Sequence, residues 1–153
     1  MHNLTDNVIL RDFRSEDSAA VILLWERCGL TRAWNDPGKD IQRKCDEGDR
    51  GGTGWFWVAE YDGQIIGAVM AGYDGHRGSV NYLAVAPEFQ GYGVGRAMMR
   101  KLEAGLKAAG CPKLNVMVRT TNSEVRAFYE RLGYVTDDVA VLSRRLIVDQ
   151  QGG

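Results

Sequence analysis

The chain has 153 residues, of which 44% are hydrophobic and 25% are charged. These values are typical of a folded protein, so one domain spanning residues 1–153 is expected. The formal net charge of −1 provides no basic field for a nucleic acid or an anionic membrane, and neither partner is expected. The unusual feature is the 19 glycines among 153 residues, a share well above the average of about 7%.

The three cysteines, Cys28, Cys45 and Cys111, are odd in number and far apart in the chain. They predict neither a disulfide framework nor a zinc site, and no metal is expected. No apolar run approaches the roughly 20 residues that span a bilayer. The first residues also lack the basic and apolar regions of a signal peptide. The expected location is therefore the cytoplasm.

The first elements are a strand over residues 8–14 and a helix that Ser15 caps and Gly29 ends. Apolar residues at helical spacing predict the buried face of this helix, namely Val21, Leu24, Trp25 and Cys28. A second helix is expected to begin at Asp36-Pro37 and to run towards Gly48.

A glycine-rich loop over 48–54 leads to two strands, 55–61 and 64–70, which are joined at the hairpin turn Asp62-Gly63. A polar loop over 73–78 precedes another strand. That strand contains Val80, Tyr82, Leu83 and Val85, and Pro87 ends it.

The second half of the chain predicts a helix over 94–109 and a strand over 114–118. A capping box, Thr121-Asn122-Ser123-Glu124, begins the next helix, and Gly133 ends it. The buried stripe of that helix is expected at Val125, Phe128, Tyr129 and Leu132. Weak strands over 134–139 and 141–147 complete an α/β or α+β layer fold. Its mostly antiparallel mixed sheet is flanked by about four helices.

Three alternating glycines stand where a strand gives way to a helix, in the run Gln90-Gly91-Tyr92-Gly93-Val94-Gly95-Arg96. A helix N-terminus has unpaired N–H groups, and glycines let a phosphate approach them. The spacing matches neither a P-loop nor a dinucleotide fingerprint. It predicts a phosphate or pyrophosphate on residues 91–96. The alternative is a turn that only packs a strand against a helix. Of the 19 glycines, only these three are expected to need a ligand.

Two blocks of the sequence resemble the GNAT superfamily of acyl-CoA-dependent N-acetyltransferases. The first is Gln90-x-x-Gly93-x-Gly95, and the second is Asn122 followed by Phe128-Tyr129-Glu130-Arg131-Leu132-Gly133-Tyr134. The resemblance covers about residues 8–145 and implies a GNAT-like fold. A small bacterial subgroup, the YpeA-type acetyltransferases, is similar at Trp25-Glu26-Arg27-Cys28, Trp34-Asn35-Asp36-Pro37 and the run from Gly72 to Gly78.

The resemblance implies acetyl-CoA as the cosubstrate. It places the pyrophosphate on Gln90, Gly91, Tyr92, Gly93, Val94 and Gly95, with Arg96 close by. The pantetheine arm would pair like an extra strand with Leu83, Ala84 and Val85. Asn122 matches a residue that contacts the coenzyme, and Tyr129 matches the general acid.

Tyr129 is suited to protonating a leaving thiolate, because its ordinary pKa of about 10 exceeds the roughly 8.5 of a thiol. Its place on an apolar stripe equally fits core packing. The general base is open, since the strand before the glycines carries no acid. Asn81 could hold a relay water, or Asp74 or His76 could act from the neighbouring loop. The alternative for that loop is a solvated turn.

Trp34 and Asp36 lie where this family builds its acceptor pocket. There Asp36 and Asp40 could attract an ammonium group, or Asp36 could simply cap a helix. The expected function is transfer of an acetyl group from acetyl-CoA to a primary amine by direct transfer in a ternary complex. The amine could belong to a small molecule or a protein, and the chain could be a monomer or a homodimer. The alternative is a non-catalytic acyl-CoA-binding sensor or interaction module.

Overall fold

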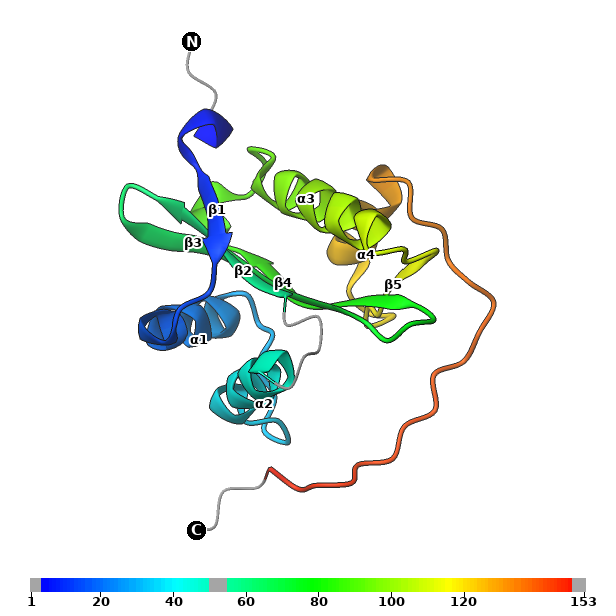
Figure 1. Cartoon of the computed structure of the whole chain (residues 1–153). Helices are drawn as coiled ribbons and strands as arrows, with labels where there is room; N and C mark the ends of the chain where they lie inside the picture. The colour runs from blue at the N-terminus through cyan, green and yellow to red at the C-terminus, as the bar shows by residue number, and fades with distance from the viewer. Residues whose placement is uncertain (1–3, 50–54, 150–153) are drawn as a thin grey trace.

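The computed structural model describes residues 4–49 and 55–149, which form one five-stranded sheet with helices on both faces (Figure 1). The longer elements are β1 (Ile9–Asp12), α1 (Ser18–Arg27), α2 (Pro37–Asp49), β2 (Trp55–Tyr61), β3 (Gln64–Tyr73), β4 (Gly78–Val85), α3 (Val94–Ala108), β5 (Leu114–Val116) and α4 (Ser123–Arg131). Short 3-10 turns cover Leu4–Asn7, Ser15–Asp17 and Pro87–Phe89.

The strands lie in the order β1-β2-β3-β4-β5. The first three pairings are antiparallel and the last, between β4 and β5, is parallel. The β2–β3 turn is the predicted Asp62-Gly63, with φ of 50° and 75°. Two positive φ values in a two-residue loop match the right-handed twist of the flanking strands. The predicted mostly antiparallel mixed sheet with four long helices is therefore confirmed.

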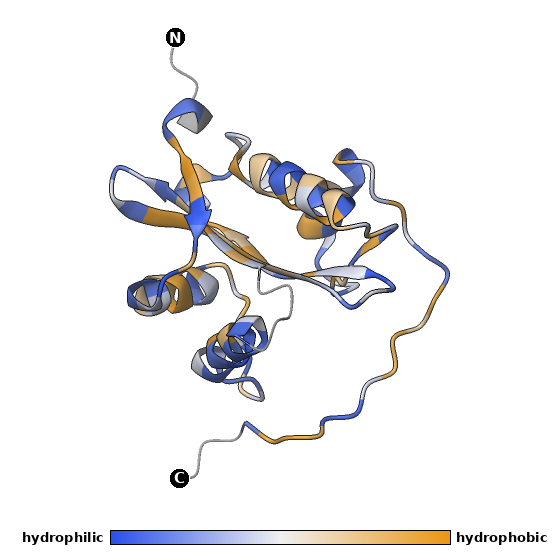
Figure 2. Cartoon of the chain, in the orientation of Figure 1, coloured by the Kyte–Doolittle hydropathy of each residue, from blue (hydrophilic) through white to orange (hydrophobic). Residues whose placement is uncertain are grey.

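The core is built around β3, whose residues from Ile66 to Ala71 are all buried. Helices α1 and α2 cover one face of the sheet, and α3 and α4 cover the other, so β3 is enclosed on both sides (Figure 1). The apolar colouring of the sheet between the two helix layers follows this arrangement (Figure 2). The largest buried contributions from the helices are Val21, Leu24, Trp25, Met98, Met99 and Leu102.

Two predicted helix starts are wrong in detail. Helix α1 follows a 3-10 turn that begins at Ser15, and its N-cap position is Asp17 and not Ser15. The Asp17 carboxylate accepts from the Arg14 N–H at 2.8 Å. At α4 the cap is Asn122, whose Oδ1 accepts from the Val125 N–H at 3.2 Å, so the predicted capping box from Thr121 is absent. A short polar side chain can cap from any of several neighbouring positions, and the local geometry selects one.

The C-terminal strands are the largest correction. Residues 134–149 form neither predicted strand and run as irregular, extended chain (Figure 1). Strand β5 also ends at Val116, two residues early, because its pairing with β4 stops there. Of the predicted loop over 48–54, Gly48 and Asp49 complete α2, and the remainder lies outside the described residues. Among the helices that the structure describes, none is long and apolar enough to cross a bilayer.

Candidate active site

Strand β4 contains a β-bulge at Tyr82. Met70 of β3 pairs with Asn81 and Ala68 pairs with Ala84, so Val69 alone faces both Tyr82 and Leu83. Tyr82 has a φ of 56°, which is uncommon outside glycine. A bulge takes backbone groups out of the ladder and leaves them available for another partner.

The bulge lies beside an open part of the sheet. The β4–β5 pairing covers only Gly78 to Val80, so the two strands separate before the bulge. From Asn81 to Val85, β4 has no neighbouring strand on that side among the described residues. The side chain of Asn81 is exposed here. The backbone edge that the sequence assigned to the pantetheine arm is therefore open over most of its length.

The carboxyl end of β4 leads directly into the glycine loop. Gly91 and Gly93 have φ values of 87° and 88°, in the left-handed region that favours glycine. Gly93 precedes α3 and offers no side-chain cap, and the first helical hydrogen bond runs from the Ala97 N–H to the Gly93 carbonyl. The preceding N–H groups at this N-terminus are therefore suited to an anion.

Gly95 has a different reason to be glycine. A Cβ at this position would lie 3.1 Å from the ring of Phe128 and 3.6 Å from Val85. Gly95 thus lets α3 pack closely on α4 and β4, so packing alone accounts for a glycine here, and its contact with the coenzyme stays a prediction. Gln90 also has an internal role, because its Nε2 donates to the Val85 carbonyl at 2.9 Å and fixes the loop to the strand end.

The rest of the predicted coenzyme loop divides into exposed and buried positions. The Tyr92 side chain is 55% exposed, whereas Val94 is buried and belongs to the core. Any contact of Val94 with a ligand would therefore come from its backbone. On β4, Ala84 is buried and Leu83 is half-buried.

Sequence reasoning placed Arg96 beside this N-terminus but missed two further arginines that cluster with it. Arg96 and Arg100 of α3 and Arg131 of α4 line one cavity of about 150 Å³ together with Met99, Glu103 and Leu132. The three guanidinium groups form no ion pair with the described residues. Their one acidic neighbour, Glu103, accepts a hydrogen bond from Tyr134. Positions 96 and 100 share a helix face, but nothing local in the sequence places Arg131 next to them.

Tyr129 is 7% exposed and packs edge-on against two rings, Phe128 at 5.1 Å and Tyr134 at 5.4 Å between centroids. Burial raises the pKa of its hydroxyl above the ordinary value, so the group is protonated at neutral pH. Its hydroxyl makes no hydrogen bond with the other described residues. Of the predicted α4 stripe, Tyr129 alone is buried, while Val125 is 37% exposed.

The side chain of Tyr82 lies on the face of the sheet that α1 and α2 cover, opposite the face that carries Tyr129. Its ring stacks on Trp25 with centroids 4.0 Å apart, and its hydroxyl donates to Asp40 Oδ2 at 2.6 Å. Arg43 donates to the other oxygen of Asp40 at 3.2 Å. Because both oxygens of Asp40 are engaged, this carboxylate is suited to holding the bulge in place. Burial and the Asp40 carboxylate raise the pKa of Tyr82.

The predicted acceptor residues lie on the loop before α2. Asp36 caps that helix, since its Oδ1 accepts from the Lys39 N–H at 3.1 Å, so the capping alternative holds. The Trp34 side chain is 53% exposed, and the Arg119 guanidinium lies 5.8 Å from its ring centroid. Arg119 follows β5, so the loop before α2 meets the segment after β5.

The structure does not bring Asp74 and His76 to this site. Both lie on the β3–β4 turn, and about 13 Å of strand separates Gly78 from the bulge. Asp74 Oδ1 accepts from the N–H groups of His76 and Arg77, both at 2.8 Å, and these bonds lower the pKa of the carboxyl. The solvated-turn alternative explains this loop.

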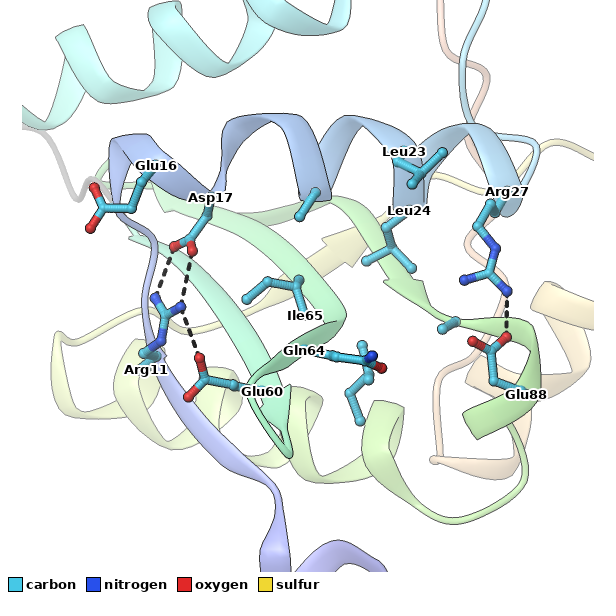
Figure 3. A pocket seen from close by; sticks show the side chains of 14 residues that line it. Arg11, Glu16, Asp17, Leu23, Leu24, Arg27, Glu60, Gln64, Ile65 and Glu88 are labelled. Atoms are coloured by element: carbon cyan, nitrogen blue, oxygen red, sulfur yellow. Dashed lines mark hydrogen bonds and ion pairs between the residues drawn. The ribbon is translucent and has the colours of Figure 1, made fainter.

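A second cavity, of about 390 Å³, lies between α1 and the β2–β3 hairpin (Figure 3). Both of its arginines are already paired with carboxylates. Arg11 binds Asp17 at 2.8 Å and Glu60 at 3.4 Å, and Arg27 pairs with Glu88. None of the predicted site residues lines this cavity. Its ion pairs connect β1 to β2 and to the 3-10 turn before α1, and connect the end of α1 to the 3-10 turn after β4. No cluster of potential metal ligands occurs in the described ranges 4–49 and 55–149.

Together, the bulged strand, the separated β4–β5 pair and the glycine loop before α3 form an open strand edge that leads to a helix N-terminus suited to an anion. The family model described as "Acetyltransferase (GNAT) family" matches residues 19–134, and the chain belongs to this family. It is therefore a GNAT-type acetyltransferase, as the sequence predicts.

Curated relatives of the chain are also named acetyltransferases. The chain is 51% identical over 142 residues to "Acetyltransferase YE1169" of Yersinia enterocolitica, which covers 93% of this chain and 98% of the relative. It is 50% identical, with the same coverage, to "Acetyltransferase ECA0875" of Pectobacterium atrosepticum.

Solved structures share the fold at low sequence identity. The PaiA N-acetyltransferase from Thermoplasma acidophilum, in complex with coenzyme A, superposes with a TM-score of 0.71 at 16% identity, covering 87% of this chain and 92% of that one. The ribosomal-protein-S18-alanine N-acetyltransferase from Escherichia coli gives 0.67 at 22% identity, over 82% and 76%.

Proposed function

We propose that the protein transfers the acetyl group of acetyl-CoA directly to a primary amine in a ternary complex. The bulge at Tyr82–Leu83 carries this proposal, because it frees backbone groups on an open strand edge. That edge leads into an anion-binding helix N-terminus. Neighbours of the same fold were crystallised with coenzyme A or acetyl-CoA, which supports the choice of cosubstrate.

The pyrophosphate is assigned to the N–H groups between Gly91 and Arg96. The positive φ of Gly91 and Gly93 leaves these N–H groups accessible. The amide groups of the pantetheine arm would pair with the open β4 edge at Leu83 and Ala84. The Val85 carbonyl already accepts from Gln90 and from the Cys28 thiol, so Val85 contributes less. Asn122 keeps its amide NH₂ for the coenzyme while its oxygen caps α4.

The arginine cluster (Arg96, Arg100 and Arg131) is assigned to the 3′-phosphate of the coenzyme. Three guanidinium groups without an acidic partner among the described residues favour a multiply charged anion. Arg96 belongs to the first turn of the helix whose N-terminus would hold the pyrophosphate, so one coenzyme could be bound at both places.

The chemistry follows from three groups. The acceptor ammonium first loses a proton to water, for which Asn81 supplies an exposed polar side chain next to the bulge. The free amine then attacks the thioester carbonyl, and an N–H of the bulge stabilises the oxyanion. On collapse the C–N bond is complete, the C–S bond breaks, and the Tyr129 hydroxyl donates its proton to the departing sulfur. The attacking nitrogen gives up its remaining extra proton to water, and a proton from water restores Tyr129, so the products are the N-acetyl amide and the free thiol.

The acceptor would enter between the loop before α2 and the segment after β5. Trp34 offers an exposed ring there, and Arg119 lies against it. One fold neighbour is a ribosomal-protein-S18-alanine N-acetyltransferase, so protein amines belong among the acceptors to be tested.

The test of function is thiol release from acetyl-CoA across a panel of small amines and peptides. Release should depend on an amine and should yield the N-acetyl product by mass spectrometry. Tight coenzyme binding without turnover on any amine would replace this proposal with the non-catalytic binding module.

The arginine assignment has its own test, which compares the Kd of coenzyme A with that of dephospho-coenzyme A. The wild-type protein should bind coenzyme A about tenfold or more tightly than it binds dephospho-coenzyme A. Arg131→Gln should reduce that preference several-fold. Arg126→Gln is the matched control, because Arg126 lies on the same helix and already pairs with Glu130 at 3.4 Å. An equal loss for both coenzymes in Arg131→Gln would contradict the assignment.

A further inference from the structure

The turn before α2 is bordered by two arginines that have no acidic partner. The turn closes where the Asn35 N–H donates to the Arg32 carbonyl at 3.1 Å. The Arg119 guanidinium, from the segment after β5, lies 5.8 Å from the ring centroid of Trp34. Arg145, from the chain after α4, donates to the side-chain oxygen of Asn35. Arg119 and Arg145 form no ion pair with the described residues, so two uncompensated positive charges reach adjacent residues of one turn.

The carboxylates around the start of α2 are engaged with other groups. Asp36 Oδ1 accepts from a backbone N–H of the helix. Asp40 accepts from the Tyr82 hydroxyl at 2.6 Å, and Asp149 binds Arg43. An arginine that lies against an aromatic ring without an ion pair keeps its N–H donors for another group. The planar guanidinium matches a carboxylate or a phosphate in shape and charge.

The segment after β5 starts beside the open edge of β4. Val80 lies opposite Val116 in the last pair of the parallel ladder. Asn81 and Met117 are therefore the first residues on each strand after the pairing ends, and both side chains are exposed. Asn81 stands next to the bulge, where the proposed function places the acceptor amine.

Met117 and Arg119 lie on the same side of this segment. Exposure alternates along residues 115–119, with the odd-numbered side chains exposed and Val116 and Val118 half-buried. Such alternation is typical of an extended chain with one free face, on which two residues advance about 7 Å. Because Arg119 on this face meets Trp34, the free face leads from the bulge to the turn before α2.

We infer that the acceptor carries an anionic group, a carboxylate or a phosphate, which binds Arg119 and Arg145 while the primary amine lies beside Asn81. This inference rests on the proposed acetyl transfer and names the acceptor class for it. The exposed side chains of Trp34 and Met117 would contact the apolar chain between the two groups.

The separation of the two ends narrows the class further. An amine beside the bulge and an anion at Arg119 are about 7 Å or more apart along the free face. The carboxylate of a simple α-amino acid does not reach, because only one carbon separates it from the amine. An ω-amino acid reaches, and so does a peptide whose second residue is acidic.

The test compares acceptors that differ only in this charge. The small-molecule pair is ε-aminocaproate and its amide, and the peptide pair is Ala-Glu-Ala amide and Ala-Gln-Ala amide. The acidic member should have the higher kcat/KM by about fivefold or more, mainly through a lower KM, since its anion is remote from the reacting atoms. High salt should reduce the preference. A preference confined to one pair identifies the source of the acceptor, a small molecule or a peptide.

Variants assign the preference to the arginines. Arg119→Gln should reduce it to about twofold or less, and Arg119→Lys should keep part of it, because the charge remains while the planar fork is lost. Arg144→Gln is the matched control, since Arg144 is the exposed neighbour of Arg145 and forms no ion pair with the described residues. It removes the same charge and should keep the wild-type preference. The Kd of coenzyme A checks that each variant is folded.

Two results would overturn this inference and leave the proposed function in place. One is acetylation of both members of each pair with equal kcat/KM, which would mean that Arg119 only closes the turn against Trp34. The other is a preference for the acid that survives in the double variant Arg119→Gln/Arg145→Gln. Coenzyme binding without turnover on any amine would instead remove the proposed function, and this inference with it.

Discussion

Replacing Tyr129 by Phe separates catalysis from folding. The substitution keeps the ring that packs against Phe128 and Tyr134 and removes only the hydroxyl. Because that hydroxyl has no hydrogen-bond partner among the described residues, the free energy of unfolding should change by less than about 0.5 kcal/mol.

Turnover should respond differently. General-acid catalysis contributes about 10²–10⁴-fold, so kcat should fall about 100-fold or more, equivalent to about 2.7 kcal/mol of transition-state stabilisation. Burial raises the pKa of Tyr129, which keeps its proton in place but makes it a weaker acid. The same apolar surroundings raise the pKa of the departing thiol, so the pKa of the acid and the pKa of the leaving group rise together.

The assay is initial-rate thiol release with acetyl-CoA and the best acceptor of the panel, next to urea unfolding of the same samples. Tyr134→Phe is the control. Its hydroxyl donates to Glu103, so its removal should lower the free energy of unfolding by about 1 kcal/mol and leave kcat within about twofold. Wild-type kcat in Tyr129→Phe, or a parallel loss of stability, would refute the acid role.

Three further predictions concern the supports of the site. Asp40→Asn should lower the free energy of unfolding by about 1–2 kcal/mol in urea titrations, because Tyr82 loses its charged acceptor. Gly91→Ala should lower it by about 1–2 kcal/mol through backbone strain alone, since a Cβ there meets no atom within 4 Å. Arg43 and the Asp36 N–H lower the pKa of Asp149 from 3.8 to about 2. A depressed pKa contributes stability above the unfolded value, so acid unfolding curves between pH 4 and 2 should lose this contribution, and Asp149→Asn should abolish that part of the pH dependence.

Much of the fold follows from local rules. The Asp62-Gly63 turn, the start of α2 at Pro37 and the apolar spacing of α1 each depend on a few neighbouring residues. Their conformational preferences are satisfied within one turn or one ladder, so sequence patterns predict them. The glycines at 91 and 93 belong to this group, because their left-handed φ is a local property.

Other features require contacts between distant parts of the chain. The bulge at Tyr82 depends on Trp25 and Asp40 from two different helices, and no local pattern marks it. Gly95 is the same residue type as Gly91 and Gly93, but a glycine is needed here because Phe128 packs on it. The arginine cluster joins two helices that are far apart in sequence.

The sequence by itself therefore determined the family, the layer fold and the glycine turn before α3, since these depend on short-range patterns. Tertiary structure alone decided which carboxylate holds the bulge, which glycine serves packing, and that residues 134–149 do not join the chain's own sheet. The physical reason is that a strand is stable only with a partner, and the side chains of a segment do not tell which strand will lie beside it.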